Sequence, residues 1–170
     1  RAATQPSRTT AARTTTTNET VDGPLMGLLL DAGYAMAGLI AAPWLLFKLA
    51  TDRRYRHKLG ERFGGVPKRD GDAPCLWLHC ASVGEVNLVK PLVKELKKRR
   101  PDLALHVSTL TMTGRENAAK TFPEARVHYF PADLSFAVAR AIRRVRPSAI
   151  ALVELEVWPN FTAAARGVPM

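Results

Sequence analysis

The sequence predicts an α/β fold built around a parallel sheet, and three observations lead to it. At 170 residues, the chain is long enough for one domain with a sizeable core. Its 46% hydrophobic and 24% charged residues exclude wholly disordered, collagen-like and disulfide-scaffold chains. From residue 75 onward, short apolar runs alternate with segments of helical periodicity, which is typical of parallel βαβ units with right-handed crossovers. The predicted sheet is therefore Rossmann-like.

Eight elements are predicted beyond residue 74, in alternation. The strands are expected over 75–80, 103–109, 126–130 and 148–154, and the helices over 84–100, 113–122, 134–145 and 159–166. In the first of these helices, the apolar residues recur at helical spacing, namely Val86, Val89, Leu92, Val93 and Leu96. Residues 168–170 are expected to begin another strand.

The first 72 residues predict three further segments. Residues 1–23 are rich in Thr, with scattered Arg and almost nothing apolar, and they predict a disordered tail. Residues 25–47 contain a single charge, Asp31, and as a helix they extend roughly 35 Å, against about 30 Å for the hydrocarbon core of a bilayer. The prediction is a membrane-anchoring helix over 24–50, a basic juxtamembrane segment over 51–72 and the Rossmann-like domain over 73–170.

The apolar segment has other interpretations that stay open at this point. It could be a buried core helix, or a helix lying in the membrane interface, since Asp31 makes full insertion costlier. A cleaved signal peptide is disfavoured because the dense positive charge follows the apolar run. By the positive-inside rule, the same charge predicts that the following residues lie on the cytoplasmic side.

The charge of the chain predicts partners rich in phosphate. With 25 Lys and Arg against 15 Asp and Glu, the net charge is +10, which suits nucleic acid, an anionic membrane or a phosphorylated substrate. Only 7% of residues are aromatic and no RRM, KH or helix-turn-helix pattern is visible, so nucleic acid is not expected as a partner. Cys75 and Cys80 suggest a reducing compartment, and their odd spacing along a strand places them on opposite faces.

The carboxyl ends of the strands are where ligands bind in sheets of this kind. After the first strand, Ser82, Gly84 and Glu85 enter a helix, where free N–H groups favour an anion. The same residues also fit a capping box, with Ser82 and Glu85 closing the helix end. The patterns G-x-G-x-x-G, G-x-x-x-x-G-K-[ST] and G-x-S-x-G are all missing from the sequence, which disfavours dinucleotide binding, Walker-type nucleotide binding and α/β-hydrolase chemistry.

The fourth strand ends in two carboxylates, Glu154 and Glu156. At the end of a buried strand such groups are costly unless they are paired, hydrogen-bonded or used in chemistry. Glu156 could equally cap the helix that follows, whereas Glu154 lies further from the helix start. His79 beside Cys80 suggests a metal pair, but neighbouring strand residues point to opposite faces, so a buried histidine is the better interpretation.

Four segments occur in a recognisable order. They are residues 55–64 (YRHKLGERFG), 79–85 (HCASVGE), 109–114 (TLTMTG) and 154–160 (ELEVWPN). Together they resemble motifs of the Kdo transferases, which add 3-deoxy-D-manno-octulosonic acid (Kdo) to lipid A precursors. The resemblance begins near residue 25, and Cys80 and Leu155 stand where other residues are commoner in the family.

The resemblance implies a two-domain glycosyltransferase of the GT-B type that is inverting, needs no metal or other cofactor, and takes Kdo from CMP-Kdo. Residues 73–170 would then be the acceptor-side domain, and without a donor-side domain this chain alone is expected to be inactive. Glu85 is implied to be the general base, and Glu154 to stabilise the transition state. The substrate-binding residues implied in the same way are Ser82, Gly84, Thr113, Gly114, Glu156, Trp158 and Asn160.

The implied partners are a lipid A precursor, CMP-Kdo and an anionic membrane surface, at the cytoplasmic face of the inner membrane. Two alternatives stay open from the sequence. One is another membrane-associated GT-B glycosyltransferase with a different sugar nucleotide, and the other is an inactive membrane-bound fragment.

Overall fold

The computed structural model describes residues 24–51, 57–154 and 157–170. The predicted tail over 1–23 and Glu156 lie outside the described residues. The elements, in chain order, are α1 (Pro24–Thr51), α3 (Leu59–Arg62), β1 (Cys75–His79), α4 (Val83–Arg99), β2 (Ala104–Thr109), α5 (Met112–Thr121), β3 (Arg126–Tyr129), α6 (Ser135–Val145), β4 (Ala149–Leu152) and α7 (Pro159–Ala164).

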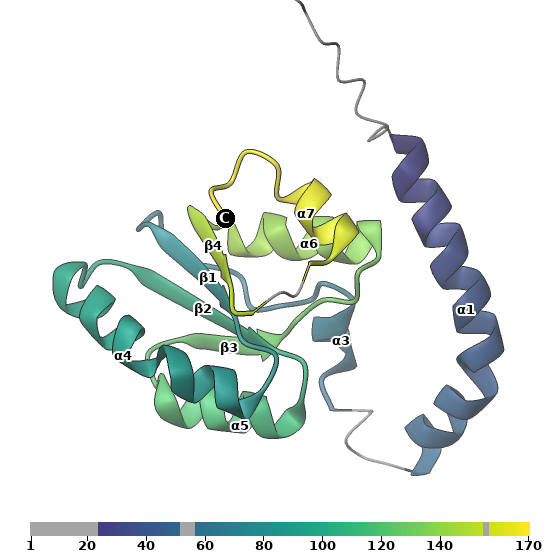
Figure 1. Ribbon diagram of the computed structural model, residues 1–170, viewed down its shortest axis with the longest axis horizontal. Coiled ribbons are helices and arrows are strands. Elements are labelled where there is room, and N and C mark those ends of the chain that lie inside the picture. The colour runs from purple at the N-terminus through teal and green to yellow at the C-terminus, as the bar shows by residue number, and fades with distance from the viewer. Residues whose placement is uncertain (1–23, 52–56, 155–156) are drawn as a thin grey trace, which may run out of the picture.

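The four strands form one sheet in the order β3-β2-β1-β4, and every neighbouring pair is parallel (Figure 1). This confirms the predicted α/β fold with a Rossmann-like sheet. α4 and α5 cover one face of the sheet, and α6 and α7 cover the other. Since each face of a parallel sheet is buried, both clusters of apolar side chains contribute to the core.

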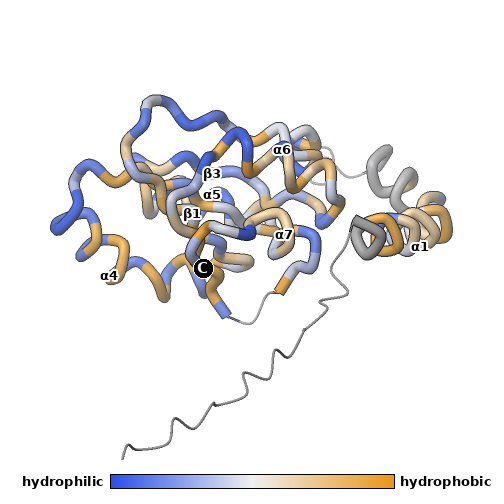
Figure 2. The backbone as a smooth tube through the Cα atoms, turned by 90° about the horizontal axis from the view of Figure 1, so that it is seen from above, coloured by the Kyte–Doolittle hydropathy of each residue, from blue (hydrophilic) through white to orange (hydrophobic). Residues whose placement is uncertain are grey.

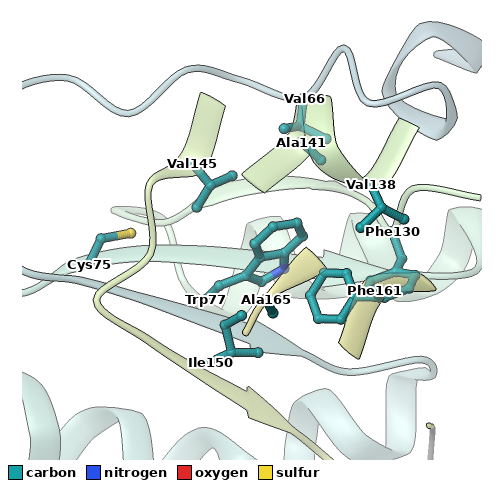
Figure 3. Close-up of a cluster of buried hydrophobic side chains, with 10 residues drawn as sticks. All are labelled: Val66, Cys75, Trp77, Phe130, Val138, Ala141, Val145, Ile150, Phe161 and Ala165. Carbon is teal, nitrogen blue, oxygen red and sulfur yellow. The ribbon is translucent and has the colours of Figure 1, made fainter. Parts of the chain in front are cut away.

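Alternation along β1 divides its side chains between the two clusters. Cys75 and Trp77 point to the α6 and α7 side, whereas Leu78 and Cys80 point to the α4 and α5 side. The two cysteines are buried and free, and they lie on opposite faces as predicted. Trp77 lies at the centre of its cluster, with its ring edge-to-face against Phe161 at a centroid distance of 5.1 Å (Figure 3).

Polar side chains lie within the core beneath α6 and α7. The indole N–H of Trp77 donates to Ser108 Oγ at 2.8 Å, and His79 Nδ1 lies 3.0 Å from the same oxygen. The ring of His79 packs on Phe130, with the ring centroids 4.1 Å apart. His79 is fully buried, which confirms the interpretation of a core histidine.

The boundary predicted at residue 73 lies inside the packed unit. Val66 belongs to the core cluster, and the Arg69 N–H donates to the Arg144 carbonyl of α6 at 3.0 Å. Gly64 lies in the left-handed region (φ 77°), where an added Cβ would approach the Ala137 carbonyl oxygen to 2.1 Å. Gly64, Val66 and Arg69 of the predicted basic segment therefore pack against the α6 side of the domain, whereas its residues 52–56 lie outside the described residues.

α1 confirms a helix over the apolar segment, with Pro43 inside it. It stands beside the α/β domain rather than within its core, as Figures 1 and 2 show. Large apolar side chains on α1 are exposed, including those of Leu29, Met36 and Ile40, so α1 is not part of the core that the described residues form, contrary to the core-helix alternative. In the part of the chain that the structure describes, none of the helices combines the length and the hydropathy needed to cross a membrane.

Two strand ends differ from the prediction. β4 ends at Leu152, two residues early, and Glu154 adopts a left-handed conformation (φ 64°) that leaves the strand direction. Residues 168–170 form no strand, although the Pro169 carbonyl accepts a hydrogen bond from the Ile150 N–H at 2.8 Å.

Two buried histidines make the fold sensitive to acid. Burial lowers the pKa of His106 to about 3 and that of His128 to about 4, and the His106 ring nitrogens have no hydrogen-bond partner among the described residues. Both histidines are therefore neutral in the folded state, whereas the unfolded chain takes up protons below about pH 6.5. Stability should be complete above this pH and fall below it, by up to about 1.4 kcal/mol per pH unit for each histidine.

Urea unfolding at pH 7, 6 and 5 measures this effect. His106→Leu should flatten the dependence, whereas His57→Gln, at a partly exposed position, serves as the matched control. A free energy of unfolding that stays constant from pH 7 to pH 5 would contradict the expectation.

Candidate functional site

The site lies where the direction of strand addition reverses. From β1 the chain adds β2 and β3 on one side, and β4 then pairs with the other side of β1. Ligands bind outside the carboxyl ends of the strands at such a reversal. The loops after β1 and β4 meet there, since the Val153 N–H donates to the His79 carbonyl at 3.0 Å. The two predicted catalytic carboxylates are close to these loops in the sequence: Glu85 is in the first turn of α4, and Glu154 follows β4.

Glu85 is buried and closes the amino end of α4. Its Oε2 accepts from the Ala81 N–H at 2.8 Å, and its Oε1 accepts from Ser82 Oγ at 2.7 Å. The Glu85 N–H donates in return to Ser82 Oγ at 3.4 Å. Ser82 caps α4 and Glu85 closes its amino end, as the capping box predicts, although the carboxylate accepts from the N–H of Ala81 and not from that of the N-cap residue Ser82. Each carboxylate oxygen still has a lone pair for a further donor.

The thiol beside Glu85 is not a nucleophile. Burial, with the negative charge of Glu85 as a second cause, raises the pKa of Cys80 to about 12. Nucleophilic cysteines need the opposite shift, toward the thiolate. The candidate chemistry at the end of β1 therefore belongs to the carboxylate and to the Ser82 hydroxyl.

A second helix end lies against this turn. The Thr111 side chain caps α5 by accepting from the Gly114 N–H at 3.0 Å, and the Leu110 N–H donates to the Ala81 carbonyl at 3.2 Å. A Cβ on Gly114 would lie 2.9 Å from Thr111 Oγ1 and 3.6 Å from the Ala81 carbonyl, so glycine permits this close approach. The amino ends of α4 and α5 are brought together, and their dipoles both favour an anion.

Exposed groups surround these helix ends. Ser82 and Gly84 are exposed at the start of α4, and Thr113 is exposed in the first turn of α5, with its Oγ1 3.4 Å from that of Thr111. The structure thus brings together four of the predicted substrate-binding residues and Glu85. Hydroxyls and backbone N–H groups are the donors that a phosphate or a sugar hydroxyl needs.

The segment after β4 is arranged differently. Glu154 is exposed, and its left-handed backbone is a conformation that non-glycine residues rarely adopt, so its geometry is held by the surroundings. Trp158 is partly buried, with its ring centroid 5.8 Å from that of Phe130. Asn160 is buried and donates through Nδ2 to the Asp133 carbonyl at 2.7 Å. The described contacts of Trp158 and Asn160 are therefore internal.

Asp133 is a structural residue that the sequence reasoning missed. Its two carboxylate oxygens accept from the backbone N–H groups of Asn160 at 3.1 Å and Phe161 at 2.8 Å, which closes the amino end of α7. Its place between a strand and a helix is the signal that could have identified it, because Asp is frequent at helix starts.

Glu61 was also missed. It is buried, accepts from the Tyr129 N–H at 2.9 Å and pairs with Arg115 of α5 at 3.3 Å. Arg62, the next residue, donates to the Leu110 carbonyl at 2.9 Å and lies over the Tyr129 ring at 4.4 Å. One acidic residue within a basic run was the available signal, and these contacts fix α3 at the carboxyl edge of the sheet.

Comparison with known proteins shows the family of the chain that carries this site. Residues 57–170 match the model of a family described as 3-deoxy-D-manno-octulosonic-acid transferase (kdotransferase), and this match covers well over half of the chain. The chain belongs to the Kdo transferase family. The matched region contains three of the four motifs whole and most of the first, and α1 precedes it.

Several curated relatives carry the same name. A 3-deoxy-D-manno-octulosonic acid transferase of Haemophilus influenzae is 40% identical over 114 residues, which are 64% of this chain and 26% of the relative. One of Chlamydophila psittaci is 35% identical over 141 residues, which are 81% of this chain and 33% of the relative. A probable mitochondrial one of Arabidopsis thaliana is 30% identical over 109 residues, covering 64% and 24% respectively. The chain spans about a quarter to a third of the length of these relatives.

A cleft of about 280 Å³ lies away from this edge of the Kdo transferase domain. It is formed by the later turns of α4, the start of β2 and the residues after α5. Its lining includes Val93, Leu105 and Phe122, with Lys90 and Lys94 also lining it. Because Leu105 is at the amino end of β2, the cleft and the candidate site are at opposite edges of the sheet.

Removal of the Glu61 carboxylate should be strongly destabilising. Glu61→Ala leaves the nearly buried Arg115 without its carboxylate and the Tyr129 N–H without an acceptor, and breaking a buried ion pair in this way costs about 3–5 kcal/mol. Urea unfolding measures the loss.

The matched control is Asp70→Ala, which removes the carboxylate of a more exposed ion pair with Arg126. Such a pair contributes about 0–1 kcal/mol. Equal losses in the two variants would contradict the structural role of Glu61.

Proposed function

We propose that this chain is the acceptor-side part of a GT-B glycosyltransferase that moves Kdo from CMP-Kdo to a lipid A precursor in lipopolysaccharide biosynthesis. The observation that carries the proposal is the position of Glu85. Its carboxylate is held at the strand reversal, between two helix ends that favour anions, in a chain of the Kdo transferase family. Membership of the family supports Kdo as the transferred sugar, and the position of Glu85 supports its role as general base.

Glu85 acts as the general base in this proposal. An acceptor hydroxyl donates to Glu85 Oε1, in place of the Ser82 hydroxyl that occupies this oxygen. As the acceptor oxygen forms its bond to the anomeric carbon of Kdo, the bond from that carbon to the phosphate oxygen of CMP breaks. The acceptor proton passes to Glu85, CMP leaves with the bonding electron pair, and attack opposite the leaving group inverts the anomeric centre.

Glu154 and the helix ends bind and stabilise in the same scheme. Positive charge develops on the Kdo ring as CMP departs, and the exposed carboxylate of Glu154 stabilises it from the other side of the strand reversal. Ser82, Gly84, Thr113 and Gly114 offer hydroxyl and backbone donors to the acceptor. We assign the acceptor contacts of the 154–160 segment to Glu156 and Trp158, with Asn160 holding the segment in place.

The donor is held by a second domain in this proposal, and neither domain needs a metal or other cofactor. Relatives three to four times longer than the aligned stretch have room for such a domain. The acceptor is a phosphorylated lipid in an anionic leaflet, so the net charge of +10 favours the cytoplasmic face of the inner membrane. Each surface Lys or Arg near such a leaflet contributes about 1 kcal/mol.

Glu85→Gln separates catalysis from capping. The test protein is a chimera in which residues 57–170 replace the corresponding stretch of the Haemophilus influenzae relative. Gln can still occupy the capping box but cannot take a proton, so transfer should fall roughly a hundredfold or more at an unchanged melting temperature. Kdo transfer and thermal unfolding are measured on one sample.

Glu124→Gln, at an exposed position beside Lys97, is the control and should transfer at the parent rate. Near-normal transfer by a folded Glu85→Gln chimera would leave Glu85 with the capping role alone.

The 170 residues alone should be inactive as a transferase, because the donor is held by the second domain in this proposal. Purified as they stand, they are expected to show no transfer from CMP-Kdo to a lipid A precursor, while the chimera transfers Kdo under the same conditions. Circular dichroism establishes that both are folded. Turnover by the 170 residues would contradict the assignment of the donor to a second domain.

A further inference from the structure

α1 is fastened to the domain near its amino end. Asp31, the only charge between residues 25 and 47, accepts from the Ser135 N–H at 3.3 Å and from the Ser135 hydroxyl. The Asn160 side chain donates to the same carboxylate at 3.3 Å. One turn further on, the Tyr34 hydroxyl donates to Asp133 at 3.3 Å. The partners of Asp31 and Tyr34 are thus at the amino ends of α6 and α7.

The chain returns to the domain soon after α1 ends. His57 Nδ1 lies 3.2 Å from the Tyr129 hydroxyl, and α3 follows directly on the carboxyl edge of the sheet. From Asp31 to Thr51 the helix rises about 30 Å. Asp31 contacts the domain, and His57, six residues after the end of α1, contacts it again. α1 stands beside the domain, as Figure 1 shows.

The two sides of α1 differ in chemistry. Successive residues are about 100° apart, so Leu29, Met36, Ile40 and Phe47 all lie on the side opposite Asp31. These four side chains are between 63% and 81% exposed. The side of Asp31 carries instead Tyr34, Gly38 and Ala42. The large apolar side chains therefore point away from the polar fastening.

We propose that α1 lies in the plane of the membrane surface, with its outer face of Leu29, Met36, Ile40 and Phe47 in one leaflet of anionic phospholipid. In a helix that crossed the bilayer, Asp31 would lie in or beyond the hydrocarbon core while the domain stayed in water, which would break its contacts with Ser135 and Asn160. An interfacial helix keeps them and buries its apolar face about 5–10 Å deep.

Charge supports phospholipid as the occupant. The residues just after the helix include Arg53, Arg54, Arg56 and Lys58, against one acidic residue, Asp52. Basic residues beside an interfacial helix attract anionic lipid. Asp31 does not need to enter hydrocarbon, because the domain supplies its hydrogen-bond donors.

This placement has a consequence for the acceptor, which rests on the proposed function. α6 and α7 begin after the carboxyl ends of β3 and β4, so the helix fastened to them lies along the edge that carries the candidate site. The membrane would meet that edge, where a lipid-linked acceptor arrives. Asp31 and Tyr34 are then positioning residues for the site.

Depth measurements test the proposal. Single cysteines at Leu29, Met36, Ile40 and Phe47 carry nitroxide labels in the full 170-residue chain, bound to vesicles of phosphatidylethanolamine and phosphatidylglycerol. Cys75 and Cys80 are buried and stay unlabelled. The four labels should lie at one shallow depth, and a label at Ala42 should meet little lipid. A depth profile that is greatest at Ile40 and shallow at both ends would overturn the proposal, because it describes a spanning helix.

A cross-link tests the fastening without reference to membrane depth. Leu30→Cys with Leu134→Cys, each next to a residue of this contact, should be joined by a bifunctional thiol reagent in the vesicle-bound chain, because neither substitution removes a group of the contact itself. Met36→Cys with Leu134→Cys, on the outer side of the helix, is the matched control and should not react. Failure of the first pair to cross-link would also overturn the proposal. Neither experiment measures Kdo transfer, so each outcome is separate from the fate of the proposed function.

Discussion

A parallel sheet must be covered on both faces, because strands joined by crossovers bury both sets of their alternating side chains. In this chain the requirement is met by two helices on each side, together with residues 64–69 that extend the α6 and α7 layer. Every crossover then begins at the carboxyl end of a strand. Helices cover both faces of the sheet. The polar turns at the carboxyl ends of the strands are therefore the part of the sheet that a substrate can reach.

Small features decide how tightly that edge is assembled. Gly114 lets the turn after β2 approach the turn after β1, and Asp133 ties the start of α7 to the residues after β3. Glu61 and Arg62 bring the segment before β1 to the same edge. Elements distant in the sequence therefore support the turn that holds Glu85, and a substitution at any of these positions would act on the site without touching a substrate.

Much of the sheet could be predicted from the sequence, because periodicity is a property of each segment by itself. The alternation of apolar runs and helices identified all four strands, and the order of Ser82 and Glu85 identified the capping box. What could not be predicted depends on contacts between distant residues. The burial of Glu61 requires Arg115 and Tyr129, and the left-handed turn at Glu154 ends a strand that local propensity alone would have continued.

The two buried thiols have a practical consequence. Cys75 begins β1, a central strand of the sheet, Cys80 directly follows it, and each faces a different core cluster. Burial raises the pKa of both, so neither presents a thiolate to an oxidant or an alkylating reagent while the sheet is intact. Their modification requires the innermost part of the fold to open. The rate at which these two thiols are modified therefore reports global unfolding, and no cysteine or label has to be introduced to measure it.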